Sequence, residues 1–370
     1  MNRIAKFALA LTGLLALSGV AVACGGDDDD DEPTVAATAA ATTAAATATT
    51  AAPATPTPKP SGSITVYSGR TEALIKPLIE QFQRDSGITV NVKYGDTTQL
   101  AALLIEEGSK SPADVYIAQD AGALGAVGAA GLLDTLPATL LEAVPPTFRA
   151  QNNSWVGLSA RARVISYNSE LVPEADLPKS YKELTNAKWK GQVGWAPTNA
   201  SFQSFVTAIR RIDGDAAADK WLKDMLANDA KVFTGNLPIV EAVNKGEIKL
   251  GLVNHYYLYQ LIKTAGDNVK AKNLFTANGD AGSLVNVAGA GMLKSTKNKP
   301  AALAMLQYLL APSGQQYFRA ETYEYPVVTG QAADARLKPL ADLKPPTLDL
   351  SKLDDLQATL ALLRSSGVLK

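Results

Sequence analysis

Histidine and cysteine are almost absent from this chain of 370 residues, which contains one histidine, His255, and one cysteine, Cys24. Zinc sites built from several such side chains are therefore excluded. A Ser-His-Asp triad would have to use His255, but the chain has no Gly-x-Ser-x-Gly sequence to support one. It also lacks the Gly-x-Gly-x-x-Gly and Walker sequences that bind nucleotide cofactors. The sequence thus disfavours the common types of enzyme site.

An excess of charge of one sign is also missing. The chain has 35 basic and 36 acidic residues, which gives a formal net charge of −1. No basic stripe interleaved with aromatic residues is present, so a nucleic-acid partner is disfavoured. Behind the N-terminal leader, no apolar run is long enough to span a bilayer. Neither nucleic acid nor a membrane-spanning segment is expected in the body of the chain.

The N-terminus has the pattern of a secretory signal. Arg3 and Lys6 form a basic start, and the apolar run 7–22 is followed by small residues. The sequence 21–25, Ala-Val-Ala-Cys-Gly, resembles a bacterial lipobox, although Ala21 stands where leucine is commoner. Residues 1–23 are predicted to be a signal peptide, and Cys24 is predicted to be the lipid-bearing residue. Lipidation would account for an unpaired thiol in an exported protein. The alternative is an ordinary signal peptide that leaves a free thiol.

A low-complexity segment follows the predicted anchor. Five aspartates, 27–31, and Glu32 precede a stretch, 33–60, made almost wholly of Ala, Thr and Pro. Such a composition has too few large apolar side chains to offset the entropy of ordering. Residues 24–61 are therefore predicted to be a lipid anchor and a disordered tether. An exported body would be held on the outer face of the cytoplasmic membrane, in a periplasm or at the cell surface.

The body of the chain, from about Gly62 to Lys370, alternates short β-type runs with helical patterns. This alternation predicts an α/β fold with mainly parallel sheets that carry helices on both faces. The length exceeds what one core usually supports, so two lobes across a cleft are expected. The predicted strands are 64–67, 88–92, 113–117, 192–195 and 248–253, and the predicted helices are centred on 74–82, 100–105, 121–133, 202–209 and 239–243.

Polar residues recur where the predicted strands end and the next helices begin. In parallel sheets, ligands bind beyond the carboxyl ends of the strands. The residues at these strand ends and helix starts therefore form the candidate site. They are residues 67–71, 118–120, 199–201, Asn236 and 254–257.

Two adjacent tyrosines, Tyr256 and Tyr257, stand at the start of a predicted helix after the 248–253 strand. The N–H groups and the positive dipole end of a helix start favour negative charge, so phenolates are easier to form there. A pair of phenolates is a hard anionic oxygen site that suits Fe(III). For an isolated pair, packing or an aromatic surface for a sugar would be the preferred interpretation.

Several short sequences together make the body, from about Gly62 to Lys370, similar to the extracytoplasmic ferric-ion-binding proteins of iron ABC transporters. The resemblance implies a two-lobe type II periplasmic-binding-protein fold, with chain crossings near Arg163 and Asn286. It places lobe 1 at 62–163 plus about 287–338, and lobe 2 at 164–286 plus about 339–370. The similar sequences are 67–70 (Tyr-Ser-Gly-Arg), 112–115 (Pro-Ala-Asp-Val), 161–164 (Arg-Ala-Arg-Val), 188–191 (Lys-Trp-Lys-Gly), 254–259 (Asn-His-Tyr-Tyr-Leu-Tyr) and 288–291 (Ala-Gly-Ala-Gly).

The same resemblance implies a ligand set. Tyr256 and Tyr257 would bind Fe(III), which is carried as the transported ligand. A synergistic anion, phosphate or carbonate, would complete the metal shell near a helix N-terminus. The positions that match the anion-binding residues are Asn199, Ala200, Ser201, Asn236 and Asn254.

This chain departs from the family at three positions. Thr71 and Gln119 stand where some members have a histidine and a glutamate, and Phe202 stands where others have a third tyrosine. Gln119 could coordinate through its amide oxygen, and Asp120 is next to it. With two phenolates alone the ion is under-ligated, so iron binding is expected to depend strongly on the anion.

The resulting hypothesis is a non-enzymatic, monomeric solute receptor. Capture would close the lobes, and the closed form would deliver iron to a membrane permease of an ABC importer. Since iron must displace two phenolic protons, acid should loosen it. Two alternatives remain: the same fold binding a phosphonate, a polyamine or an inorganic anion without iron, and an anchored hydrolase that uses His255 and a carboxylate.

Overall fold

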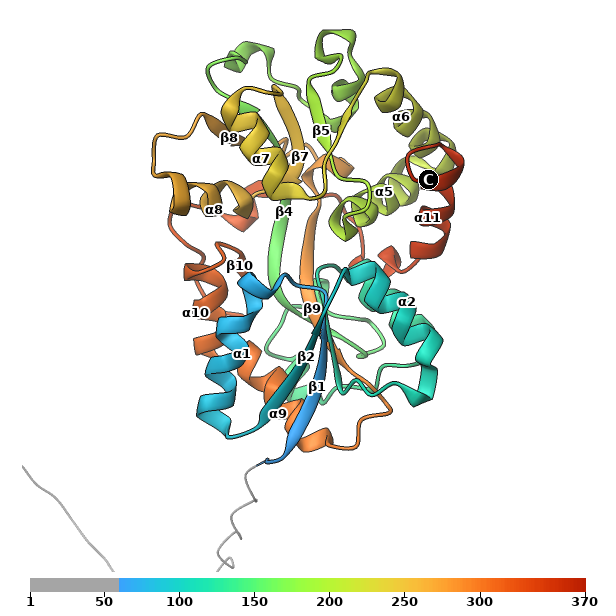
Figure 1. The fold of residues 1–370 in the computed structure, drawn as a ribbon, viewed down its shortest axis with the longest axis vertical. Helices are drawn as coiled ribbons and strands as arrows, with labels where there is room; N and C mark the ends of the chain where they lie inside the picture. Colours follow the sequence, from blue (N-terminus) through green and yellow to red (C-terminus); the bar gives the residue numbers. More distant parts are fainter. Residues whose placement is uncertain (1–59) are drawn as a thin grey trace, which may run out of the picture. The chain divides into compact units, whose positions relative to one another are not determined.

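The computed structural model describes residues 60–370 (Figure 1). The predicted signal peptide, Cys24 and nearly all of the predicted tether therefore lie outside the described residues. Among the described residues, no helix is both long and apolar enough to cross a membrane.

The first part of the body has the predicted β-α-β-α-β order. β1 (Ser63–Ser68) pairs in parallel with β2 (Thr89–Tyr94) on one side and β3 (Val115–Ala118) on the other. The intervening helices are α1 (Glu72–Ser86) and α2 (Thr97–Glu107), and α3 (Ala121–Ala129) follows β3. The predicted elements are confirmed, although α3 ends four residues earlier than expected.

Helix α1 follows the expected apolar pattern. Ile75, Leu78, Ile79 and Phe82 are its buried residues, at helical spacing, and the helix continues through Pro77. It ends at Gly87, whose φ of 76° places it in the left-handed region that glycine adopts readily.

One long strand, β4 (Val156–Asn168), joins the two parts of the sheet. Its first half, up to Ala162, pairs with β9 (Val285–Met292), and from Arg163 onward it pairs with β7 (Leu250–Asn254). Figure 1 shows β4 and β9 running side by side between the two groups of helices. All of β4 except Tyr167 is buried, including two arginines.

The second part repeats the parallel arrangement. β5 (Val193–Trp195) pairs in parallel with both β6 (Lys231–Val232) and β7. The strand order of the whole sheet is β2-β1-β3-β9-β4-β7-β5-β6, while β8 (Ala271–Leu274) and β10 (Tyr325–Pro326) pair with β4. The sheet is therefore mixed: two parallel groups are joined by antiparallel strands. The helices of this part are α5 (Ala200–Asp213), α6 (Asp215–Ala227), α7 (Asn236–Lys245) and α8 (Tyr256–Ala265).

The remaining helices pack on both parts of the fold. α9 (Lys299–Leu310) lies against α1 through the rings of Tyr308 and Phe82, whose centroids are 5.3 Å apart. The short α4 (Ala138–Leu141) contacts α9, and α10 (Pro312–Ala320) follows α9 in the chain. The last helix, α11 (Leu356–Ser365), packs on α5, where the hydroxyls of Thr359 and Thr207 are 2.7 Å apart. The chain therefore ends on the second part.

Candidate metal and anion site

The loops that follow β1, β3, β5 and β7 carry the candidate residues. The Thr97 hydroxyl, at the start of α2, donates to the Gly69 carbonyl (2.9 Å) and accepts from the Gln119 N–H (3.1 Å). It therefore ties the loop after β1 to the loop after β3. Position 69 must be glycine because a Cβ there would lie 2.0 Å from the Thr97 hydroxyl and 2.8 Å from its Cα.

The tyrosine pair begins α8, one residue after β7 ends. The two rings are stacked, with centroids 4.2 Å apart and planes at 29°. Tyr256 is fully buried and Tyr257 is 8% exposed. The Tyr256 hydroxyl has no hydrogen-bond partner among the described residues. A buried phenol is normally paired, so this hydroxyl is a candidate position for a ligand.

Ionisation of Tyr256 is harder than its place at a helix start suggests. Burial raises the pKa of Tyr256 well above its usual value, the neighbouring Tyr257 adds to the rise, and Arg70 opposes it. The helix dipole is worth at most about 2 kcal/mol, whereas burying an unpaired charge costs more. Without a cation, Tyr256 is therefore a neutral phenol.

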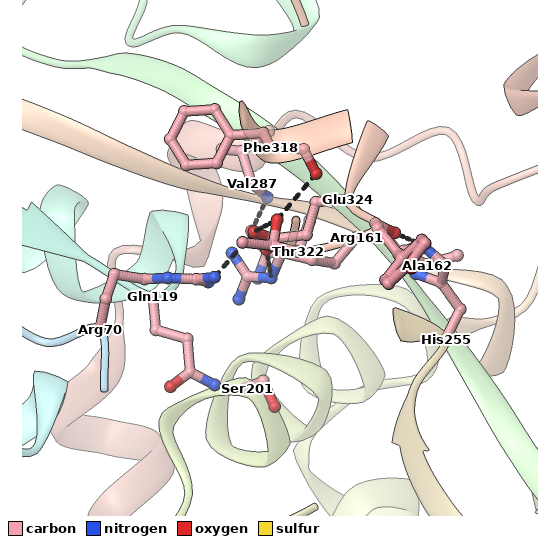
Figure 2. A network of polar contacts seen from close by, with 12 residues as sticks. Arg70, Gln119, Arg161, Ala162, Ser201, His255, Val287, Phe318, Thr322 and Glu324 are labelled. Atoms are coloured by element: carbon pink, nitrogen blue, oxygen red, sulfur yellow. Dashed lines mark hydrogen bonds and ion pairs between the residues drawn. The ribbon is translucent and has the colours of Figure 1, made fainter. Parts of the chain in front are cut away.

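A buried ion cluster lies beside the tyrosines. Arg70 Nη2 donates to Glu324 Oε2 at 2.7 Å, and Arg161 Nε lies 3.8 Å from Glu324 Oε1. The Thr322 hydroxyl also donates to Oε2, at 2.9 Å. Figure 2 shows the Arg70 and Arg161 guanidinium groups approaching the Glu324 carboxylate, with Gln119 and Ser201 nearby. Arg70, Arg161 and Glu324 are 3%, 1% and 0% exposed, so this cluster is shielded from water.

A third buried arginine, Arg163, lies on the same face of β4 as Arg161. Its guanidinium carbon is 5.0 Å from the ring centroid of Phe205 and 5.8 Å from that of Phe202. Burial lowers the pKa of Arg163 to about 9, and the interaction with Tyr257 opposes the fall. Phe202, which stands where some relatives were expected to have a tyrosine ligand, therefore packs against a cation in this chain.

The predicted anion-binding residues form a hydrogen-bonded group around Asn199. Asn199 caps α5, and its Oδ1 accepts from the Ser201 N–H (3.1 Å) and hydroxyl (2.6 Å). The same oxygen accepts from Asn236 Nδ2 at 3.2 Å and from Gln119 Nε2 at 3.4 Å. Ala200 is the first residue of α5. The structure therefore brings Asn199, Ser201, Asn236 and Gln119 together, and the Gln119 amide oxygen is the atom left for a ligand.

Asn254 and Asp120 lie around this group. Asn254 pairs with Arg163 across β7 and β4, and its Nδ2 is buried without a partner among the described residues. Asp120 caps α3 and accepts from the Ser204 hydroxyl of α5 at 2.6 Å. Burial raises the pKa of Asp120, while the bonds from Ser204 and Ala123 and the charge of Arg161 oppose the rise.

His255 serves as a structural connection. The Ala162 N–H of β4 donates to Nδ1 at 3.2 Å, and Nε2 lies 2.9 Å from the Tyr323 carbonyl. Nδ1 is therefore the acceptor and Nε2 carries the proton. Burial lowers the pKa of His255 to about 3. Both ring nitrogens are occupied by the backbone, so this histidine is not placed to act as a general base.

Sequence reasoning missed Glu324 as a site residue and did not assign roles to the three arginines. The Arg161-Ala162-Arg163 sequence does carry a signal, since two arginines two apart in a strand share one face. Glu324 carries none, because its partner Arg70 is 254 residues away in sequence. Among residues 60–370, no group of three His, Cys, Asp or Glu side chains could hold a metal ion.

The fold and the site together define a two-part α/β binding protein. A family model described as bacterial extracellular solute-binding protein matches residues 110–352. The chain belongs to this family of solute-binding proteins. The "Major ferric iron-binding protein" of Neisseria meningitidis is 35% identical over 324 residues, which cover 86% of this chain and 97% of that protein.

Solved structures agree with this assignment. Iron-bound HitA from Pseudomonas aeruginosa is 35% identical with a TM-score of 0.79, and the match covers 82% of this chain and 99% of that one. A Trichodesmium protein (IdiA, FutA) in complex with iron and citrate ligands is 31% identical with a TM-score of 0.70, covering 83% and 99%. The predicted two-lobe type II periplasmic-binding-protein fold is confirmed by these neighbours.

Proposed function

We propose that this chain is the extracytoplasmic receptor of an ABC importer and that it captures Fe(III) with a synergistic anion between two lobes. Tyr256 and Tyr257 supply two phenolate ligands, and the Gln119 amide oxygen is a candidate third. The observation that carries the proposal is the stacked tyrosine pair with an unpartnered, buried Tyr256 hydroxyl. The ferric relatives described above support the choice of metal.

The chemistry explains why a trivalent cation suits this site. A neutral, unpaired phenol in a buried position costs about 1–3 kcal/mol of stability. Binding of Fe(III) expels the phenolic protons and replaces the missing hydrogen bond with a metal–oxygen bond. The positive charge of Arg70 next to Tyr256 favours the resulting phenolate. The two tyrosines are thus neutral phenols in the absence of metal and become phenolates as the metal binds.

The proposed lobes follow the boundaries implied by the family resemblance, with 62–163 and about 287–338 in lobe 1 and 164–286 and about 339–370 in lobe 2. The change of β4 pairing between Ala162 and Arg163 supports a crossing there. The hydrogen bonds that join the proposed lobes include three between side chains near the candidate site: Thr98 to Gln203 (2.7 Å), Ser204 to Asp120 (2.6 Å) and Gln119 to Asn199 (3.4 Å). They support closure of the lobes around a bound ion.

The anion would enter beside the Asn199 group and Asn254, with phosphate and carbonate as the first candidates. The remaining proposals concern location and partners. We infer a lipid anchor at Cys24 behind a signal peptide, docking of the closed monomer on a membrane permease, and release of iron to that permease. Palmitate labelling of the protein in a bacterial host, with Cys24→Ala as comparison, tests the anchor.

Visible spectroscopy tests the metal ligands. Adding Fe(III) and an anion to apo-protein is expected to produce a tyrosinate-to-iron charge-transfer band. The Tyr256→Phe/Tyr257→Phe double variant should lose it. Tyr259→Phe is the matched control, because Tyr259 lies on the same helix and its hydroxyl donates to the Arg336 carbonyl. A band that persists in the double variant would show that other residues bind the metal.

A further inference from the structure

A polar cavity of about 450 Å³ lies at the base of the first part of the fold. It is placed between the turn that follows α2 and the loop that connects β9 to α9. Its lining includes Lys110, Ser295, Lys297, Asn298 and Ser63, the first residue of β1. The Ser295 hydroxyl is buried and has no hydrogen-bond partner among residues 60–370. Since buried hydroxyls are normally paired, this cavity is a candidate ligand site.

Unpaired lysines surround this cavity. Lys110 and Lys297 line it, and Lys294 lies three residues before Lys297 in the same loop. All three side chains are exposed, and none of them forms an ion pair among the described residues. An ammonium group binds phosphate as a point charge with three N–H donors. The lysines and the Ser295 hydroxyl together therefore suit a phosphate group.

The acidic residues beside the cavity already have partners in the protein. Asp114 also lines the cavity, but its Oδ2 accepts from the Thr65 N–H at 2.7 Å and its Oδ1 accepts from the Thr296 hydroxyl at 2.5 Å. Asp134 pairs with Lys299 at 2.6 Å. The lining thus contains two lysines and one carboxylate, which leaves one positive charge for an anion to balance.

The cavity adjoins the point where the predicted tether joins the body. Asn298 Nδ2 donates to the Ser61 carbonyl at 2.9 Å and to the Ser63 carbonyl at 3.4 Å. Figure 1 shows the start of β1 at the end of the body that lies away from β5 and α6. A tether of 37 residues, from Cys24 to Ser61, would span roughly 35 Å as a flexible coil. A lipid anchor at Cys24 would therefore keep the lysines close to the membrane surface.

This cavity is separate from the candidate iron site. Ser63 and Ser68 are the two ends of β1, and a strand of this length separates them by roughly 17 Å. The cavity lies at the Ser63 end, whereas the loop that carries Arg70 follows the Ser68 end. A ligand in the cavity would therefore leave the tyrosine pair free to bind metal.

We propose that the base of the first part faces the membrane and that the cavity holds the phosphate of an anionic lipid headgroup. Lys110 and Lys297 neutralise the phosphate, the Ser295 hydroxyl donates to it, and Lys294 adds attraction to the surrounding lipid surface. Binding would direct the opposite ends of the strands, with the candidate iron site, away from the bilayer. The proposal goes beyond iron capture and rests only on the proposed location at a membrane.

Vesicle sedimentation tests this surface. Full-length protein with Cys24→Ala is mixed with vesicles of phosphatidylglycerol and phosphatidylcholine, or of phosphatidylcholine alone. We expect tighter binding to the anionic vesicles and a loss of about thirtyfold in the Lys110→Gln/Lys297→Gln variant, because each lysine near a surface contributes about fivefold. Residues 1–59 are the same in all these proteins, so they cause no difference between them.

Lys231→Gln/Lys272→Gln is the matched control. It removes two exposed lysines of the second part that form no ion pair among the described residues, so the change in net charge is the same. This variant should bind anionic vesicles as the parent protein does. Equal binding by the two double variants would overturn the proposal.

Ser295→Ala separates a headgroup site from diffuse attraction, because it leaves the net charge unchanged. Loss of a hydrogen bond to a charged phosphate should weaken binding to the anionic vesicles by at least about tenfold. Circular dichroism melting verifies that each variant is folded. Parental binding in folded Ser295→Ala would overturn the headgroup site.

Two further measurements identify the occupant. Calorimetry with glycerol phosphate compares the parent protein with Lys110→Gln/Lys297→Gln, so that binding at the candidate anion site cancels. Free glycerol phosphate that fills the cavity as readily as the vesicles do would overturn the membrane role. Excess binding to anionic vesicles that appears only after Asp27–Asp31 and Glu32 are changed to Asn and Gln would overturn it too, because the chain's own acidic run would then be the occupant. The iron charge-transfer band should persist in every variant, so a negative result leaves the iron receptor intact.

Discussion

At the scale of single residues, the site depends on charges that are buried far from water. Glu324 is the anionic group that compensates Arg70 and Arg161, and all three side chains are at most 3% exposed. Buried pairs of this kind contribute little net stability as a whole, but removing one partner leaves an uncompensated charge. Glu324 therefore holds Arg70 and Arg161 in a stable arrangement beside the tyrosine pair.

The Glu324→Gln variant should be strongly destabilised. It removes the only carboxylate that pairs with Arg70 among the described residues, and we expect a loss of about 3 kcal/mol in the free energy of unfolding. Urea unfolding of the apo-protein measures this. Glu321→Gln is the matched control, since the pair between Glu321 and Lys263 is exposed and should cost at most about 1 kcal/mol. A loss below 1 kcal/mol in Glu324→Gln would contradict the role assigned to Glu324.

His255 predicts a specific pH dependence of stability. Burial lowers its pKa in the folded protein to about 3, while the unfolded value is about 6.5. The unfolded chain therefore binds a proton first as the pH falls. The stabilising effect of neutral His255 is fully present above about pH 6.5 and is lost at up to roughly 1.4 kcal/mol per pH unit between there and pH 3.

The His255→Gln variant tests this effect. Glutamine lacks the titrating group but can still accept from Ala162 and donate to Tyr323. The difference in unfolding free energy between wild type and variant, measured on apo-protein at several pH values, should shrink as the pH falls from 6.5 to 4. A difference that is constant over this range would show that His255 has the same pKa in the folded and unfolded protein.

At the scale of elements, local pattern predicted the strands and helices well. Apolar spacing located α1 and α5, and Asn199 marked the start of α5 because its side chain caps that helix. Tyr256 and Tyr257 were placed at the start of α8 because they follow the apolar run 248–253, which forms β7. The ion cluster could not be predicted, because it depends on contacts between chain segments far apart in sequence. The raised pKa of Tyr256 could not be predicted either, because burial is set by the whole fold.

The contact between two loops gives a prediction at this scale. Gly69→Ala would place a Cβ against the backbone of Thr97, so one of the two loops must move. We expect a destabilisation of about 1–3 kcal/mol and weaker iron binding, because Arg70 and Gln119 lie on these loops. Thermal unfolding and the charge-transfer band measure the two effects.

Gly235→Ala is the matched control for this substitution. A Cβ at position 235 would meet no atom within 4 Å, and its φ of −177° is extended backbone that any residue adopts. The Gly235→Ala variant should lose less than about 1 kcal/mol of unfolding free energy. Equal losses in both variants would mean that the approach of Gly69 to Thr97 has no special importance.

At the scale of the folded body, the hydrogen bonds between the proposed lobes suggest how binding and closure are coupled. Thr98, Gln119 and Asp120 come from the first part, and their partners Gln203, Asn199 and Ser204 come from α5 and its cap in the second. In some relatives position 119 was expected to carry a metal ligand. In this chain Gln119 Nε2 donates to Asn199 of the opposite proposed lobe, so we expect closure of the lobes to add to iron affinity through these bonds.

Small-angle X-ray scattering should detect this coupling. We expect the radius of gyration to fall when Fe(III) and anion are added together and to stay unchanged with either alone, because two phenolates without the anion leave the ion under-ligated. Gln203→Ala and Ser204→Ala each remove one bond across the cleft, worth about 1 kcal/mol, and should weaken iron binding about fivefold each. Thr185→Ala, which removes only a local bond to the Lys182 carbonyl, should bind as wild type does. Full closure in the Gln203→Ala/Ser204→Ala double variant at unchanged affinity would show that lobe 1 contributes through direct metal coordination, which would make the Gln119 amide oxygen the first atom to test.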